Sequence, residues 1–241
     1  MGSSANTGPV IARFTDSNAG QTHTCSINWD DGSNTSGTVV EPTQPSPPNQ
    51  GTCTGSHTYT QAGVYTVTFT INDGCTDGTG VYQFVVIYDA NNGFVTGGGW
   101  INSQPGSYTA NPSLTGKANF GFSSQYKRGT TIPVGETEFQ FSVGNFNFHS
   151  ASYQWLVVSG AKAQYKGYGT VNGAGNYGFL LTATDGDAQP NNAPDRMDKF
   201  RIKIWDAATN VIVYDNKIGS PEDIDLADPQ TISGGSIVIH K

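Results

Sequence analysis

The sequence contains no apolar run that approaches the roughly 20 residues required for a membrane-spanning helix. Its first residues, Met1-Gly2-Ser3-Ser4, lack the basic and apolar regions of a signal peptide. Motifs of the types G-x-S-x-G, H-E-x-x-H, the phosphate loop and paired zinc cysteines are also missing. The histidines occur singly, at positions 23, 57, 149 and 240. We therefore expect no membrane insertion and no catalysis, and we expect residues 1–7 to be an expression remnant or disordered.

Basic residues are scarce in the first part of the chain. Up to Asn92 a single base, Arg13, faces seven acids, which gives a net charge of −6. From Gly93 onward, eleven bases face twelve acids, for a net charge of −1. Nucleic-acid binding depends on clustered Lys and Arg that contact phosphates, so we exclude nucleic acid as a partner.

The abundant residues favour short strands joined by tight turns. Among 241 residues there are 31 glycines, 11% are aromatic and only 13% are charged. This composition is typical of an all-β protein. The length allows two compact domains, each able to bury a core.

Three cysteines, Cys25, Cys53 and Cys75, all lie in the first half. A Cys25–Cys53 bridge would pin the Pro-rich stretch between them and would imply an oxidising, extracellular setting. Cys75 would then remain a free thiol in a turn. The alternative is that all three cysteines are reduced.

Residues 8–90 read as a succession of short strands. In "VYTVTFTIND", Tyr65, Val67, Phe69 and Ile71 alternate with smaller or polar residues, and this period of two predicts a half-buried strand. The run "EPTQPSPPNQG" has too much proline for regular structure and predicts a surface loop.

"INWDDGS", followed by "HTYTQAGVYTVTFTINDG" and "VVIYD", resembles a PKD domain over residues of about 9–89. The resemblance implies an immunoglobulin-like β-sandwich of extracellular proteins that acts as a spacer or interaction module. Asp30 stands where that family usually has glycine. We expect Trp29 and Tyr65 to anchor the core, and His57 to be a structural partner of the Asp30-Asp31 turn, whose carboxylates could accept backbone N–H bonds.

We expect residues 91–93 to form a linker and residues 94–241 to form a second, larger antiparallel β-sandwich. The turns "VGN" and "AATN" predict hairpins. "GFVTGGGWI", "SLTGKANFGF", "NFNFHSASYQWLVV" and "DKFRIKIWD" together resemble a β-rich module found at the C-terminal end of large secreted bacterial proteins. The resemblance implies an extracellular location and carries no defined activity.

The stretch of residues 183–206 contains four aspartates, Asp185, Asp187, Asp195 and Asp198. Calcium prefers six to eight oxygen ligands, so these carboxylates predict a calcium site, with a solvated loop as the main alternative. Asp185 and Asp187 could instead act as a glycosidase pair. A second possible calcium position, at the domain junction, would use Asp16, Asp73 and Asp89.

Aromatic side chains offer a further binding chemistry, because sugar rings stack on them. Tyr153 and Trp155 have the spacing of residues on one strand face. Trp205 stands on a basic face with Arg201 and Lys203, opposite Phe200, Ile202 and Ile204. We expect Tyr153, Trp155 and Trp205 to bind a ligand, although core packing is the commoner role of such rings.

These features predict a non-catalytic fragment of a secreted or surface bacterial protein, stabilised by calcium, that serves in adhesion, ligand binding or spacing. Its partner would be an extracellular glycan or protein surface. The alternatives are a carbohydrate-binding module of a polysaccharide-degrading enzyme and a glycoside hydrolase-like activity. A Lys–Asn cross-link also remains open.

Overall fold

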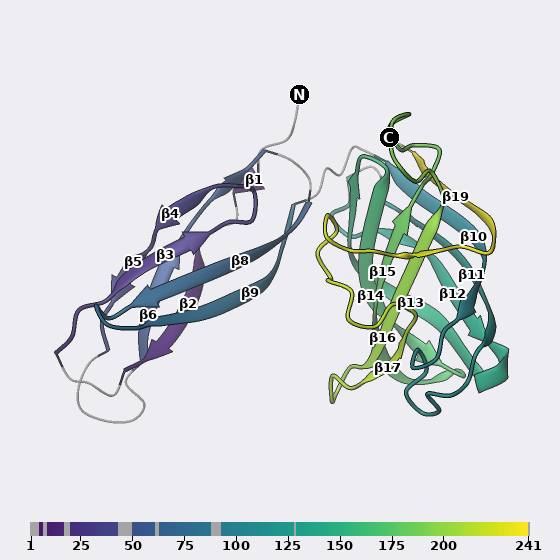
Figure 1. Cartoon of the computed structure of the whole chain (residues 1–241), viewed down its shortest axis with the longest axis horizontal. Coiled ribbons are helices and arrows are strands. Elements are labelled where there is room, and N and C mark those ends of the chain that lie inside the picture. Colours follow the sequence, from purple (N-terminus) through teal and green to yellow (C-terminus); the bar gives the residue numbers. More distant parts are fainter. Residues whose placement is uncertain are drawn as a thin grey trace. The chain divides into compact units, whose positions relative to one another are not determined.

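The computed structural model describes residues 5–6, 9–16, 20–42, 50–60, 63–87, 93–127 and 129–240. The chain forms two compact units, which comprise Met1–Ile87 and Tyr88–Lys241. Both are built from antiparallel strands, so the predicted all-β class is confirmed (Figure 1). Most of the predicted Pro-rich loop, Asp89 and residues 91–92 of the predicted linker lie outside the described residues.

The described residues of the first unit form nine strands in three sheets, with the orders β1-β7, β2-β6-β5 and β4-β3-β8-β9. The strands are β1 (Ala5–Asn6), β2 (Val10–Thr15), β3 (Thr24–Asn28), β4 (Asn34–Ser36), β5 (Thr38–Val40), β6 (Gln50–Gly55), β7 (Thr58–Tyr59), β8 (Gly63–Asn72) and β9 (Asp77–Ile87).

The core of the first unit follows the alternation of β8. Tyr65, Val67, Phe69 and Ile71 are all buried, which confirms the face predicted from their period of two. Trp29 is fully buried in the same cluster, and its Nε1 donates a hydrogen bond to Thr35. Trp29 and Tyr65 are therefore core anchors, as predicted.

The Cys25–Cys53 disulfide joins β3 of the four-stranded sheet to β6 of the three-stranded sheet. Both cysteines are buried. A Cβ at Gly37 would overlap the sulfur of Cys53, so the bridge requires glycine at this position. The predicted pairing is confirmed, and Cys75 is a free, exposed cysteine.

The turn after Trp29 is held by its two aspartates. Asp30 has φ 66°, in the left-handed region, and its carboxylate accepts the backbone N–H of Thr66 at 2.8 Å. Asp31 accepts the N–H of Ser33 at 3.0 Å and lies 2.7 Å from Nε2 of His57. His57 is thus a structural partner of the turn, as expected from the sequence.

In the second unit, the described residues form one sheet of ten strands in the order β17-β16-β15-β14-β13-β12-β11-β10-β19, with β18 paired to β16. A 3-10 turn, η1 (Ser142–Gly144), forms the predicted hairpin between β12 and β13. The strands are β10 (Phe94–Ser103), β11 (Gly116–Gln125), β12 (Val134–Phe141), β13 (Phe146–Ser159), β14 (Lys162–Val171), β15 (Ala174–Thr184), β16 (Lys199–Asp206), β17 (Ile212–Asp215), β18 (Gln230–Thr231) and β19 (Gly234–His240).

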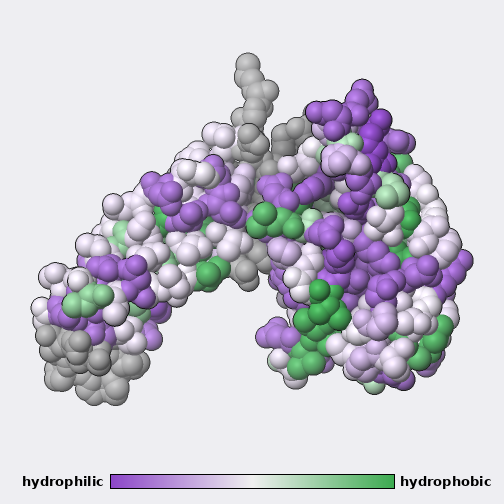
Figure 2. All heavy atoms as spheres, in the orientation of Figure 1, coloured by the Kyte–Doolittle hydropathy of each residue, from purple (hydrophilic) through white to green (hydrophobic). Residues whose placement is uncertain are grey.

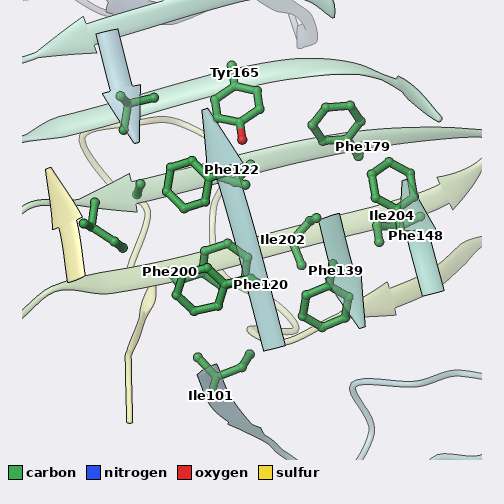
Figure 3. Close-up of a cluster of buried hydrophobic side chains, with 14 of the residues drawn as sticks. Ile101, Phe120, Phe122, Phe139, Phe148, Tyr165, Phe179, Phe200, Ile202 and Ile204 are labelled. Carbon is green, nitrogen blue, oxygen red and sulfur yellow. The ribbon is translucent and has the colours of Figure 1, made fainter. Parts of the chain in front are cut away.

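This sheet folds over so that its inner face encloses one aromatic core (Figure 3). Phe120 of β11 stacks on Phe200 of β16 with ring centroids 4.0 Å apart, so strands far apart in the sheet order meet inside. Phe200, Ile202 and Ile204 are fully buried, which confirms the predicted inner face of β16.

Residues 217–229 form a strap across the outer face of β14–β16, where Figure 1 shows this segment in yellow. Gln164 donates to the carbonyl of Glu222 at 2.7 Å, and Arg201 donates to that of Pro221 at 2.8 Å. Arg201 is only 3% exposed and binds Asp215, so this part of the predicted open basic face is covered instead. Elsewhere the viewed face of the unit mixes hydrophilic and near-neutral residues with a few hydrophobic patches (Figure 2).

Candidate ligand-binding surface

Two of the four aspartates in the acidic stretch hold the outer edge of β19. Asp185 is 5% exposed, and its carboxylate accepts the N–H groups of Ala188 at 3.0 Å and Ile239 at 2.9 Å. Asp198 accepts the N–H groups of Gly186 and Ile237, both at 2.7 Å. Among the described residues β19 pairs only with β10, so these carboxylates satisfy donors on its other edge and protect that edge.

The other two aspartates, Asp187 and Asp195, have different surroundings. Asp195 forms an ion pair with Lys199 at 2.7 Å, and the hydrogen bond from this lysine lowers the pKa of the carboxyl. Asp187 is exposed and, with Asp198, lines a shallow hollow of about 410 Å³ whose wall also contains Arg196. Within the described part of the chain, the four aspartates do not form a set of three converging ligand atoms. Calcium binding at the acidic stretch therefore remains a prediction.

One group of possible metal ligands does converge among the described residues. It consists of Glu136 and Glu138 on β12 and His149 on β13, with ligand atoms within 4.8 Å of one another. Glu138 and His149 face each other across the two strands, and their side chains are hydrogen-bonded. One imidazole and two carboxylates are a donor set that suits zinc rather than calcium.

In the first unit, Asp16 and Asp73 line the same hollow of about 350 Å³, together with Asp77 and His23. Asp16 lies 3.2 Å from Nε2 of His23. The carboxylate of Asp73 accepts the N–H groups of Thr76 and Cys75, which lower its pKa. The structure brings together two of the residues predicted for a second calcium position, whereas the third, Asp89, lies outside the described residues.

Tyr153 and Trp155 do not share a face, although their spacing predicted that they would. A register shift between them in the β13–β14 pairing turns the strand. Tyr153 is 9% exposed and lies in the core, where its hydroxyl is 2.8 Å from Thr137 and 3.2 Å from Ser150. Trp155 lies half-buried on the outer face.

Trp155 and Trp205 belong to the same outer face, separated by β14 and β15. Trp155 pairs with Lys166, Lys166 with Leu180, and Leu180 with Lys203 in one row across the sheet. The next row contains Tyr168, Gly178 and Trp205. We call this surface, formed by Trp155, Lys166, Tyr168, Lys203 and Trp205, the aromatic platform; it spans about 14 Å at a strand spacing of about 4.8 Å.

Trp205 lies flat on the sheet because its cross-strand neighbour is glycine. A Cβ at Gly178 would overlap the indole ring. Over this ring, Nζ of Lys166 lies 5.4 Å and Nζ of Lys203 lies 6.0 Å from the centroid. Lys203 is also paired with Glu222 of the strap. Burial lowers the pKa of Lys166, an effect that Glu222 opposes and Lys203 reinforces.

Trp155 and Trp205 are predicted from the sequence as ligand-binding residues, whereas Lys166 and Tyr168 are not. Alternation along β14 places Ala163 and Tyr165 in the core, and would have placed Lys166 and Tyr168 outside. Lys166 and Tyr168 lie between the two tryptophans only because β14 and β15 separate β13 from β16. This strand order cannot be read from the sequence of any one strand. The lysines with bonded partners, Lys162, Lys199, Lys203 and Lys217, contact carboxylates or carbonyl oxygens.

Comparison with known proteins returns no match, whether by family model, among curated proteins or among solved structures. Within the described residues, no helix has the length and apolar character needed to span a membrane. The disulfide is compatible with an extracellular location.

Proposed function

We propose that this chain is a non-catalytic, extracellular attachment module that binds a glycan through the aromatic platform. The observation that carries the proposal is the ring of Trp205, half-buried against Gly178, with the flexible side chains of Lys166 and Lys203 placing their Nζ atoms over it at 5.4 and 6.0 Å from the centroid. A pyranose ring stacks its C–H face on such an indole, while lysines and the Tyr168 hydroxyl bond to sugar oxygens.

The charge of the platform favours sugars that carry carboxylate or sulfate groups. Lys203 is already paired with Glu222, but Lys166 forms no salt bridge among the described residues. A ligand carboxylate could therefore take Lys166 as its partner. Such a charge-assisted bond is roughly twice as strong as a neutral one.

We propose the first unit as a PKD-like spacer or interaction module. Its buried Trp29, the Asp31–His57 turn and the buried disulfide support a rigid domain without chemistry of its own. The same glycan-binding surface would serve either an adhesin or a carbohydrate-binding module of a polysaccharide-degrading enzyme. Asp185, whose carboxylate holds Ala188 and Ile239, offers little support for a hydrolase.

Binding of the intact chain to immobilised acidic polysaccharides, such as alginate and pectin, and to neutral ones tests the proposal. We expect retention on an acidic polymer, and a loss of affinity of about tenfold or more in Trp205→Ala and Trp155→Ala, because an aromatic anchor contributes about 1.4 kcal/mol or more. Tyr82→Ala, which removes a 46%-exposed ring of the first unit, is the matched control. Equal retention of all three variants would refute the role of the platform.

A further inference from the structure

Two glycines on the outer face of the second unit have no structural requirement for glycine. Gly98 on β10 and Gly121 on β11 are direct cross-strand partners. A Cβ at Gly121 would meet nothing within 4 Å, and one at Gly98 would meet only the carbonyl of Phe120 at 3.9 Å. Neither has a positive φ. By contrast, a Cβ at Gly97 would press on the ring of Phe122, so that glycine is needed for packing.

Glycine inside a strand weakens it, by roughly 0.5–1 kcal/mol relative to alanine, and often marks a place where a ligand approaches the backbone. A cleft of about 260 Å³ lies above Gly121. We call it the amide cleft, and it is lined by Asn119, Phe120, Gly121, Glu138, Gln140 and Asn147.

The polar side chains of the amide cleft form an ordered row. Asn119 of β11 pairs with Gln140 of β12, which pairs with Asn147 of β13. All three side chains are exposed, and no hydrogen bond within the described part of the molecule engages their amide groups. Each amide offers donors and an acceptor, the combination that matches a sugar hydroxyl.

An indole extends this row at its other end. Trp100 of β10 is the cross-strand partner of Asn119. Its ring lies over Gly234, where a Cβ would come within 2.5 Å of Nε1, and Nζ of Lys117 lies 4.9 Å from the ring centroid. The row from Trp100 to Asn147 crosses four strands and spans about 14 Å at the usual strand spacing.

We propose that the amide cleft is a second glycan-binding site, separate from the aromatic platform, and that it takes a neutral oligosaccharide. The indole of Trp100 stacks on one sugar ring, and the amides bond the hydroxyls of the following units. Glu138 lines the cleft and Glu136 lies close to Glu138, and their negative charge disfavours uronates and phosphates. The exposed amides lack the apolar centre of a protein-binding surface.

The test is titration of the intact chain with neutral β-linked hexasaccharides of glucose, xylose and N-acetylglucosamine. EDTA in the buffer keeps metal from Glu136, Glu138 and His149. We expect saturable binding of at least one hexasaccharide, and at least tenfold weaker binding in Gly121→Val, with an unchanged or higher melting temperature because the new side chain enters open space. Gln140→Ala, which leaves the strand backbone unaltered, should also weaken binding.

Gly80→Val is the matched control, since Gly80 is a strand glycine of the first unit that also faces open space. It should bind as the wild type does. Absence of binding to every hexasaccharide, or an affinity unaffected by both Gly121→Val and Gln140→Ala, would overturn the proposal. Binding lost in Trp205→Ala but retained in Gly121→Val would assign the neutral ligand to the platform and would equally overturn it. The aromatic platform is tested with acidic polysaccharides and the amide cleft with neutral hexasaccharides. A negative result for the platform therefore does not decide the result for the amide cleft.

Discussion

Arg201 and Asp215 form an ion pair inside the second unit, where their side chains are 3% and 4% exposed. The pair is bidentate, with Nε–Oδ1 and Nη2–Oδ2 distances of 3.0 and 2.8 Å. The remaining guanidinium nitrogen donates to the strap at Pro221. Because both charges are compensated, the pair fixes the strap against β16 at a tolerable desolvation cost.

Asp185 performs a comparable task for β19, and its substitution gives a stability prediction. In Asp185→Asn one oxygen becomes an NH₂ group that faces a backbone N–H, so a buried donor loses its acceptor. We expect a loss of about 1–3 kcal/mol, seen as a lower thermal midpoint. The loss should be equal in EDTA and in millimolar calcium.

Asp187→Asn is the control for this prediction, because the Asp187 side chain is exposed and only its carbonyl oxygen accepts a bond, from Arg196. Its midpoint should match that of the wild type. If calcium raises the wild-type midpoint in a concentration-dependent way and Asp185→Asn abolishes this rise, the acidic stretch binds calcium, and holding the edge of β19 is not the only role of Asp185.

At the scale of elements, the disulfide is the only covalent link between the two main sheets of the first unit that the described residues contain. It closes a separation of 28 residues, for which chain entropy predicts a contribution of about 3–4 kcal/mol. Reduction should therefore lower the unfolding transition of the first unit and leave the second unchanged.

Thiol titration and calorimetry check this prediction together. The native chain should titrate one thiol, Cys75, and the reduced, unfolded chain should titrate three. A Cys25→Ala/Cys53→Ala variant should reproduce the effect of the reductant. Three reactive thiols in the native chain, or an unchanged midpoint after reduction, would show that the bridge does not stabilise this unit.

Strands with regular alternation could be predicted from the sequence, whereas the contacts of the candidate site could not. The inner faces of β8 and β16 follow directly from the period of two in their apolar residues. The register shift after Tyr153 left no local signal, so the sequence placed that ring outside. Asp185 and Asp198 bond β19 residues 54 and 39 positions away, and only the folded sheet brings them together.

At the scale of the whole molecule, the two units have different proposed roles. The first is a disulfide-bridged domain whose two histidines, His23 and His57, are paired with carboxylates. The second presents the aromatic platform on β13–β16 and the amide cleft on β11–β13. One site for acidic sugars and one for neutral sugars in the same unit would let the chain hold a mixed polysaccharide by more than one contact, which raises overall affinity.

The central claim, glycan binding without hydrolysis, is tested most directly by incubating the intact chain with the polysaccharide that retains it and measuring bound protein and released reducing ends in the same samples. The account predicts saturable binding that Trp205→Ala weakens, with reducing ends no higher than in a protein-free control. Release of reducing ends that disappears in Asp185→Asn/Asp187→Asn, or a failure to bind any polysaccharide, would contradict it.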